Sequence, residues 1–307
     1  MRKNLIKYAT LLALSTALIS GTNNFLTKIA VTVIPNPIVF TTLKNGLVAA
    51  VLIGLIILFK KRSEIKNLTR RQIGKLTAVG VIGGFVPFAL FFTGLTMTSG
   101  LNASLIHKTL FLWVLILAVP ILKEKVTKLQ LLGIAAIFAA NLVIGGFQGF
   151  KYNLGELMIL AATILWAIEN IIAKIALKDL SSLTVAGARM TIGSALLLGL
   201  VAGQGNLGMF SGLSLAQWGW TLITSLLLTG YVLTWYTALK YAPATYVATL
   251  LVTATLVTNV LTAVFITHTF SGKMALSAFL FYLGAELVIK FSQLPQAPVK
   301  RPQAAEL

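Results

Sequence analysis

Cysteine is absent from all 307 residues of the sequence. Its absence excludes disulfides, thiolate metal sites and cysteine nucleophiles. Histidine is almost absent, because His107 and His268 are the only two, so a histidine-based catalytic site has little material. The sequence also lacks an HExxH zinc motif, a GxSxG nucleophile elbow and a GxxxxGK[ST] phosphate loop. We therefore expect neither an enzyme nor a metal site, and no cofactor.

Charge is scarce as well, since charged residues make up 10% of the sequence while 57% of it is hydrophobic. A soluble protein usually carries about 25% charged residues. Apolar runs of roughly 20 residues, each long enough to span a bilayer as a helix, recur along the chain. The sequence predicts an all-α integral membrane protein with ten transmembrane helices, at 6–28, 36–59, 74–95, 101–121, 129–147, 155–177, 183–203, 216–239, 244–267 and 272–291.

Basic residues outnumber acidic ones by 25 to seven, and their positions predict the orientation of these helices. If the N-terminus is cytoplasmic, every segment predicted inside holds at least one Lys or Arg, and the outside segments hold only Lys151 and Lys273. This is the asymmetry that membrane insertion produces, so the net charge of +18 indicates a lipid bilayer as partner and no nucleic acid. The pattern supports cytoplasmic termini and an even number of helices more firmly than it supports ten.

The two halves of the sequence resemble each other. The stretch Asn24–Ala30 matches Asn170–Ala176, which lies 146 residues later, and Thr93–Leu95 matches Thr237–Leu239. Five helices per copy is an odd number, so the second copy enters the membrane from the opposite side. We therefore expect two inverted five-helix repeats, 1–148 and 149–291, followed by a polar cytoplasmic tail, 292–307. Inverted repeats suit alternating access in transporters, although duplication could also serve only to build a stable bundle.

These motifs resemble those of the drug/metabolite transporter superfamily, EamA type. The resemblance rests on Asn24 and Lys28, on a basic residue in the second helix, and on Glu124 leading into Gln130–Gly133. The sequence departs from the family pattern in having Lys44 in place of Arg, and His268 where a second glutamate is expected. The resemblance implies ten helices, a cell (inner) membrane location, and export or exchange of small metabolites, often amino acids.

Ionisable and aromatic residues within the spans are the candidates for a functional site, because charges at membrane depth are costly and tend to be functional. Lys28 and Lys174 come near helix ends, where they either snorkel to the headgroups or cap carbonyls of a neighbouring helix. The candidate substrate-binding and translocation residues are Lys44, Phe88, His107, Lys108, Trp166, Glu169, Arg189, Tyr231 and Trp235, and the repeat motif comprises Asn24, Lys28, Asn170 and Lys174.

Each candidate has a structural alternative. Lys44 and Arg189 would bind a carboxylate at opposite gates, or serve in an internal ion pair or carbonyl cap. His107 and Lys108 have no basic counterparts in the other half, which favours substrate contact, but a hydrogen-bonded helix contact explains His107 equally well. Glu169 would meet a substrate ammonium group or a proton, or would only pair with Arg189. The aromatic residues are compatible with a binding site and also with ordinary packing.

The excess of basic residues in the spans, opposed only by Glu169 and Glu286, favours a solute that carries a carboxylate. We therefore predict a secondary transporter of small carboxylate-bearing metabolites, with amino acids favoured over simple anions. The alternatives are a nucleotide-sugar or lipid-precursor carrier, or a membrane scaffold that transports nothing.

Overall fold

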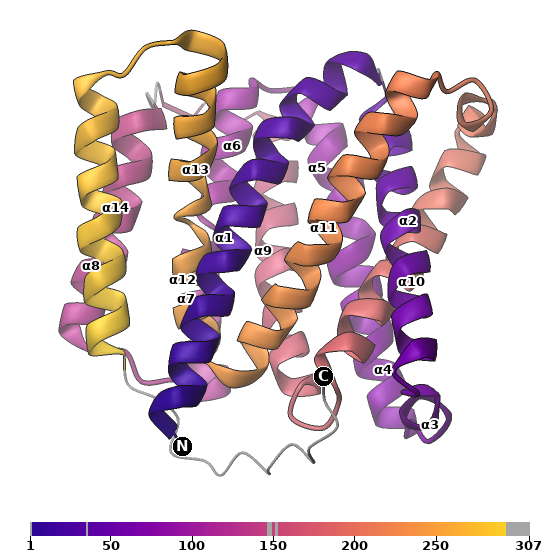
Figure 1. Ribbon diagram of the computed structural model, residues 1–307, viewed down its shortest axis with the longest axis horizontal. Helices are drawn as coiled ribbons and strands as arrows, with labels where there is room; N and C mark the ends of the chain where they lie inside the picture. Colours follow the sequence, from indigo (N-terminus) through magenta and orange to yellow (C-terminus); the bar gives the residue numbers. More distant parts are fainter. Residues whose placement is uncertain (1, 35, 146–148, 151–152, 293–307) are drawn as a thin grey trace.

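The computed structural model describes residues 2–34, 36–145, 149–150 and 153–292, and the secondary structure in these ranges is helical throughout. Ten helical segments are long and apolar enough to cross a bilayer, and they run side by side in one bundle (Figure 1). Their bounds agree with the predicted spans to within a few residues, so the prediction of ten membrane helices is confirmed. The predicted repeat boundary at 148 and the tail from 293 onward lie outside the described residues.

Seven of the spans are unbroken helices: α1 (Arg2–Val33), α2 (Pro37–Leu58), α8 (Lys128–Gly145), α9 (Leu154–Ala176), α10 (Ser182–Gly203), α11 (Leu215–Tyr241) and α14 (Gly272–Phe291). The third span comprises α4 (Arg70–Ala78), the π-helical turn η1 (Val79–Gly83) and α5 (Val86–Leu95). The fourth comprises α6 (Gly100–Lys108) and α7 (Leu110–Leu122), and the ninth α12 (Ala244–Leu251), α13 (Ala254–Thr262) and η3 (Ala263–Thr267). Two short helices, α3 (Arg62–Lys66) and η2 (Asn206–Phe210), lie between spans.

Most of the long helices begin at a residue that caps its own helix. Side-chain oxygens accept hydrogen bonds from first-turn N–H groups at Asn36, Thr69, Ser99, Asn153, Ser181, Ser214 and Ser271. Such caps satisfy N–H groups that have no partner within the helix. Helix α12 differs, because Pro243 stands at its start and offers no side-chain cap.

Glycines allow close backbone approach in two of the four main helix pairs. Extensive contacts join α8 to α14, α1 to α11, α2 to α10, and α5 to α9. Gly133 lies against the Gly284 backbone, and Gly94 against that of Gly155, so closely that an added Cβ would overlap the facing carbonyl oxygen. Close backbone approach at small residues is the usual means of packing helices in membranes, where no hydrophobic force drives their association.

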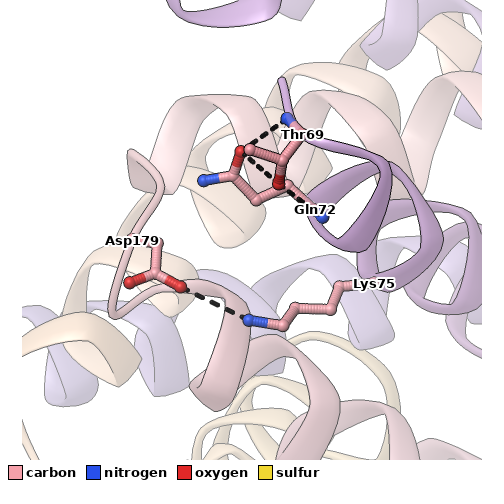
Figure 2. A network of polar contacts seen from close by, with 4 residues as sticks. All are labelled: Thr69, Gln72, Lys75 and Asp179. Atoms are coloured by element: carbon pink, nitrogen blue, oxygen red, sulfur yellow. Dashed lines mark hydrogen bonds and ion pairs between the residues drawn. The ribbon is translucent and has the colours of Figure 1, made fainter. Parts of the chain in front are cut away.

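The first residues of α1 and the last residues of α14 lie at the same end of the bundle, which is also the end that carries α3 (Figure 1). Two polar contacts tie loops together at this end. The Lys75 Nζ of α4 lies 3.3 Å from Asp179 Oδ2, beside the Thr69–Gln72 capping box (Figure 2), and Glu64 Oε1 accepts a 2.7 Å hydrogen bond from the Ser181 N–H. Because the Asp179 side chain is 55% exposed, we expect the ion pair to contribute no more than about 1 kcal/mol.

Candidate functional site

The third span is interrupted where glycines and a proline follow one another. The π-helical turn η1 ends at Gly83, and Pro87 stands in the first turn of α5. Because proline has no N–H, the carbonyl of Gly83, four residues earlier, receives no hydrogen bond from position 87. Two side chains from other spans supply donors instead, Trp166 Nε1 at 3.0 Å and Arg189 Nη2 at 3.2 Å. Two of the predicted site residues, Trp166 and Arg189, thus donate to the Gly83 carbonyl oxygen at the break in this span.

Glu169 lies on α9 beside the same glycine. Its side chain is 2% exposed, and its Oε1 accepts a 2.6 Å hydrogen bond from the Tyr236 hydroxyl on α11. A Cβ added to Gly83 would overlap the Glu169 side chain and would approach Arg189 Nε to 3.1 Å. The absence of a side chain at position 83 therefore makes room for both charged groups.

Arg189 projects from α10 toward this point. It lies within electrostatic range of Glu169, Tyr231 and Tyr236, and its Nε is buried without a hydrogen-bond partner. Among the described residues it forms no ion pair within 4.0 Å of Glu169. The interpretation of Glu169 and Arg189 as a simple salt bridge is therefore not what the structure shows, and the Nε–H of the guanidinium is a donor that no protein group uses.

Aromatic rings surround the second side of the site. The Trp166 ring lies 4.9 Å from the His107 ring and 5.2 Å from the Phe88 ring, measured between centroids, and Phe91 lies within 5.8 Å of Trp166. His107 Nδ1 is buried without a hydrogen-bond partner. The helix-contact interpretation predicted a hydrogen bond for His107, and its ring contacts, together with this free nitrogen, place it instead among aromatic residues beside Trp166.

Tyr231 and Trp235 form a parallel stack on α11, with ring centroids 6.1 Å apart and an interplanar angle of 7°. Trp235 is buried in the main hydrophobic core, whereas Tyr231 is half-buried. Tyr231 is the member of the pair within electrostatic range of Arg189 and Glu169. The structure thus brings Tyr231 to the site, and Trp235 packs behind it.

Two predicted lysines lie elsewhere. The Lys44 ammonium on α2 lies 5.2 Å from the centroid of the Phe40 ring, and within the described residues no hydrogen bond or ion pair joins it to Arg189 or Glu169. Lys108 ends α6, where it lies within electrostatic range of the like charge of Lys28. Glu286, the second acidic residue of the spans, is exposed on α14. None of these three groups is part of the arrangement around Gly83.

The repeat motif behaves differently in the two halves. Asn170 is buried and its Nδ2 donates to the Trp166 carbonyl at 2.9 Å, while Lys174 Nζ donates to carbonyls at the end of α11. The predicted capping role is therefore confirmed for Lys174. Asn24 and Lys28 are exposed, and Lys28 donates no comparable bond among the described residues.

Gly83 and Tyr236 are site residues that sequence reasoning did not single out. The signal for Gly83 was Pro87, four positions later, whose missing N–H exposes a carbonyl. Tyr236 adjoins Trp235, and no periodicity distinguishes it as the partner of a glutamate on another helix. Within the described residues, no group of three or more His, Cys, Asp or Glu side chains is placed to hold a metal ion.

Comparison with known sequences agrees with this architecture. The model of the EamA-like transporter family matches residues 7–146 and 153–290. The chain is 35% identical over 159 residues to YyaM of Bacillus subtilis (strain 168), named as an uncharacterized transporter, covering 50% of this chain and 52% of that protein. An uncharacterized transporter of Methanothermobacter thermautotrophicus is 24% identical over 145 residues, covering 45% of this chain and 42% of that protein. The chain thus matches about half the length of each of these curated relatives.

A solved crystal structure shares the fold, with a TM-score of 0.75 at 18% identity over 91% of this chain and 97% of the other. At this identity the likeness concerns the fold alone. The family match covers nearly all of both halves of the chain, in agreement with the ten membrane helices. The chain therefore belongs to the EamA-like transporter family.

Proposed function

We propose that this protein is a secondary transporter, an exporter or exchanger, that moves a small carboxylate-bearing solute across the membrane without changing it chemically. The favoured solute is an amino acid or a similar zwitterion. One observation carries the proposal: Arg189 and Glu169, groups of opposite charge, flank Gly83 at the break of the third span without forming a direct ion pair.

The charges suit a zwitterion better than a simple ion. A guanidinium has five N–H donors; Arg189 Nη2 donates to Gly83 O, while its Nε–H has no partner. A substrate carboxylate would accept hydrogen bonds from the remaining donors of Arg189. The planar guanidinium can bind both carboxylate oxygens at once, which a lysine ammonium group cannot do in the same way. Glu169 would attract the ammonium group. The rings of Trp166, Phe88 and His107 would contact the apolar part of the solute.

The helix pairing supports alternating access. If each span is exchanged for the one five spans away, the pair α1–α11 becomes α9–α5, while α2–α10 and α8–α14 each map onto themselves. The backbone agrees, because the fourth and ninth spans each end at a residue with positive φ, Lys123 and His268. These relations are those expected of two inverted repeats, which give inward-open and outward-open states of similar energy.

We place the protein in the cell (inner) membrane with both termini in the cytoplasm. The support is the distribution of lysine and arginine, which favours the end of the bundle that carries α3.

A competition experiment tests the substrate class. Purified protein in sealed proteoliposomes is screened for uptake of labelled metabolites, and the transported solute is then challenged with an amino acid, its carboxyl amide and its deaminated acid. We expect the amino acid to compete best and the amide to compete at least about tenfold less well, because it cannot form charge-assisted hydrogen bonds with Arg189. If the amide competes as well as the amino acid, the carboxylate is not recognised and the proposal fails.

Variants at Arg189 test the site itself. Arg189→Ala should abolish transport more completely than Arg189→Lys, which keeps the charge but loses the planar fork. Lys273→Ala, at an exposed lysine in the first turn of α14, is the matched control and should transport normally. Normal transport by a folded Arg189→Ala protein would show that Arg189 takes no part in binding or gating, and a wild-type protein that moves no solute would favour the scaffold alternative.

A further inference from the structure

The turn between α11 and α12 is held by two charged side chains from other spans. Lys174 Nζ, on α9, donates to the carbonyls of Leu239 at 2.5 Å and Ala242 at 2.6 Å. An ammonium group at this position satisfies carbonyls that α11 leaves unpaired and opposes the negative end of its dipole. Glu124, which follows α7, accepts from the backbone N–H groups of Ala244 at 2.6 Å and Thr245 at 3.0 Å.

The need for Glu124 follows from the residue that begins α12. Pro243 has no side chain that can accept from the first turn, so the cap comes from a distant carboxylate. The corresponding helix of the first half, α6, begins at Ser99, whose Oγ accepts from the Asn102 N–H at 3.2 Å. A self-capped helix requires no second glutamate, which accounts for His268 standing where the family pattern led us to expect one.

Lys28 has no such partner in the first half. Because Thr93–Leu95 aligns with Thr237–Leu239, the carbonyls equivalent to those of Leu239 and Ala242 are those of Leu95 and Thr98, at the end of α5. Lys28 is exposed instead, and no hydrogen bond joins its ammonium to a carbonyl within the described residues. The helices differ slightly in the same way, since α9 touches both α11 and α12, whereas α1 makes less contact with α5 and with α6 within the described residues.

We propose that Lys174 and Lys28 form two alternating latches, one at each end of the bundle. In the conformation described, the Lys174 latch, defined as its ammonium group on the carbonyls of Leu239 and Ala242, closes the end that carries the N-terminus. In the other conformation this latch opens, and the Lys28 ammonium binds the carbonyls of Leu95 and Thr98 to close the opposite end. This inference rests on the alternating access proposed above, and it assigns that exchange to specific residues.

The two latches exclude each other for a mechanical reason. Helix α1 packs along α11, α12 and α13, so these segments form one side of the bundle, while α9 packs along α5, α6 and α7 on the other. Lys174 and Lys28 each connect one side to the other, but at opposite ends. A tilt that brings Lys28 to α5 therefore draws Lys174 away from α11.

Paired spin labels measure this tilt directly. The sequence contains no cysteine, so two introduced cysteines carry the only labels. Tyr8→Cys with Lys178→Cys reports on the end that Lys174 closes, and Thr32→Cys with Met97→Cys reports on the opposite end. All four positions are exposed. Distance distributions are recorded by double electron–electron resonance on the full chain in lipid nanodiscs, without added solute.

We expect wild type to show mainly the short distance for the first pair and the long distance for the second. Lys174→Gln should raise the population with the Lys28 latch closed, relative to the population with the Lys174 latch closed, by about tenfold or more. The reason is that hydrogen bonds to a charged group are lost from only one of the two states. Lys28→Gln should lower the same ratio. Lys273→Gln, which removes an exposed lysine that belongs to neither latch, should leave both distributions unchanged.

Variants that leave both distributions as in wild type, or that shift them in the same direction, would overturn the latches. Lys28 is exposed, so Lys28→Gln should fold and can decide the question even if Lys174→Gln does not. A wild-type protein with one fixed distance at each end would overturn alternating access and the latches together. If wild type exchanges between two distances but neither Lys28→Gln nor Lys174→Gln changes their populations, only the latches are overturned. The carboxylate site is then judged by the competition experiment.

Discussion

Individual atoms at Gly83 govern the arrangement of the site. The carbonyl of this residue accepts hydrogen bonds from Trp166 and Arg189, and its missing side chain leaves room for Glu169. The Tyr236 hydroxyl then donates a hydrogen bond to Glu169. Residues from four spans therefore meet at one glycine, and the site depends on the size of that residue as much as on the charges around it.

Gly83→Ala should damage transport strongly. Its Cβ would overlap the Glu169 side chain, and overpacking of this kind typically costs about 1–3 kcal/mol. We expect flux in proteoliposomes to fall by about tenfold or more, with a lower thermal unfolding midpoint. Gly74→Ala, in the same span but with open space around the new Cβ, should retain wild-type flux. Equal flux from the two variants would show that Gly83 does not position Glu169.

Tyr236→Phe tests the hydrogen bond to Glu169 while keeping the ring. A buried hydrogen bond to a charged group is worth about 1.5–3 kcal/mol, so we expect transport to fall by about tenfold or more, measured as initial uptake rate against solute concentration. Tyr282→Phe removes a hydroxyl from an exposed tyrosine on α14 and should have no effect. Unchanged uptake by Tyr236→Phe would mean that Glu169 needs no positioning from α11.

Sequence reasoning identified the charged groups of this site better than their partners. Arg189 and Glu169 were predictable because a charge in an apolar span is costly and therefore conspicuous. Their common neighbour Gly83 was not, because its role comes from the carbonyl that Pro87 leaves free, which is a property of the folded backbone. Lys44 was assigned to the site through its match with Arg189, but the structure places its ammonium over the Phe40 ring instead.

At the scale of the helix, the bundle combines rigid pairs with interrupted spans. The pairs α8–α14 and α5–α9 meet at glycines that allow their backbones to touch. The third, fourth and ninth spans are broken, and the breaks in the third and fourth lie beside Trp166 and His107. The positions of the spans followed directly from the length of the apolar runs. The breaks in the fourth and ninth spans could not be predicted, because no proline stands at either break.

Gly284→Leu should loosen the α8–α14 pair. A Cβ at position 284 would lie 2.6 Å from the Gly133 carbonyl oxygen, so the helices must separate and lose contact along their length. We expect a loss of about 1–3 kcal/mol, seen as a lower thermal unfolding midpoint in detergent. Gly199→Leu, at a position on α10 with open surroundings, is the matched control, and a similar midpoint for both variants would contradict the packing role of Gly284.

The whole molecule has one predicted orientation, and it can be tested without any knowledge of the solute. Reporter fusions placed after Leu180 and after Phe291 should both give a cytoplasmic signal, because the basic residues favour that side. A fusion after Gly212, in the connection between α10 and α11, should give the opposite signal. A non-cytoplasmic signal from either of the first two fusions would reverse or reject this topology.

The Trp166 hydrogen bond has an optical consequence. The excited state of an indole is sensitive to a hydrogen bond at Nε1 and to nearby rings, and Trp166 has both, through Gly83 O and His107. A solute arriving at Arg189 would disturb the carbonyl that the two side chains share. With the other tryptophans, Trp113, Trp218, Trp220 and Trp235, replaced by phenylalanine, the emission of Trp166 would follow occupancy of the site in real time and without an external dye.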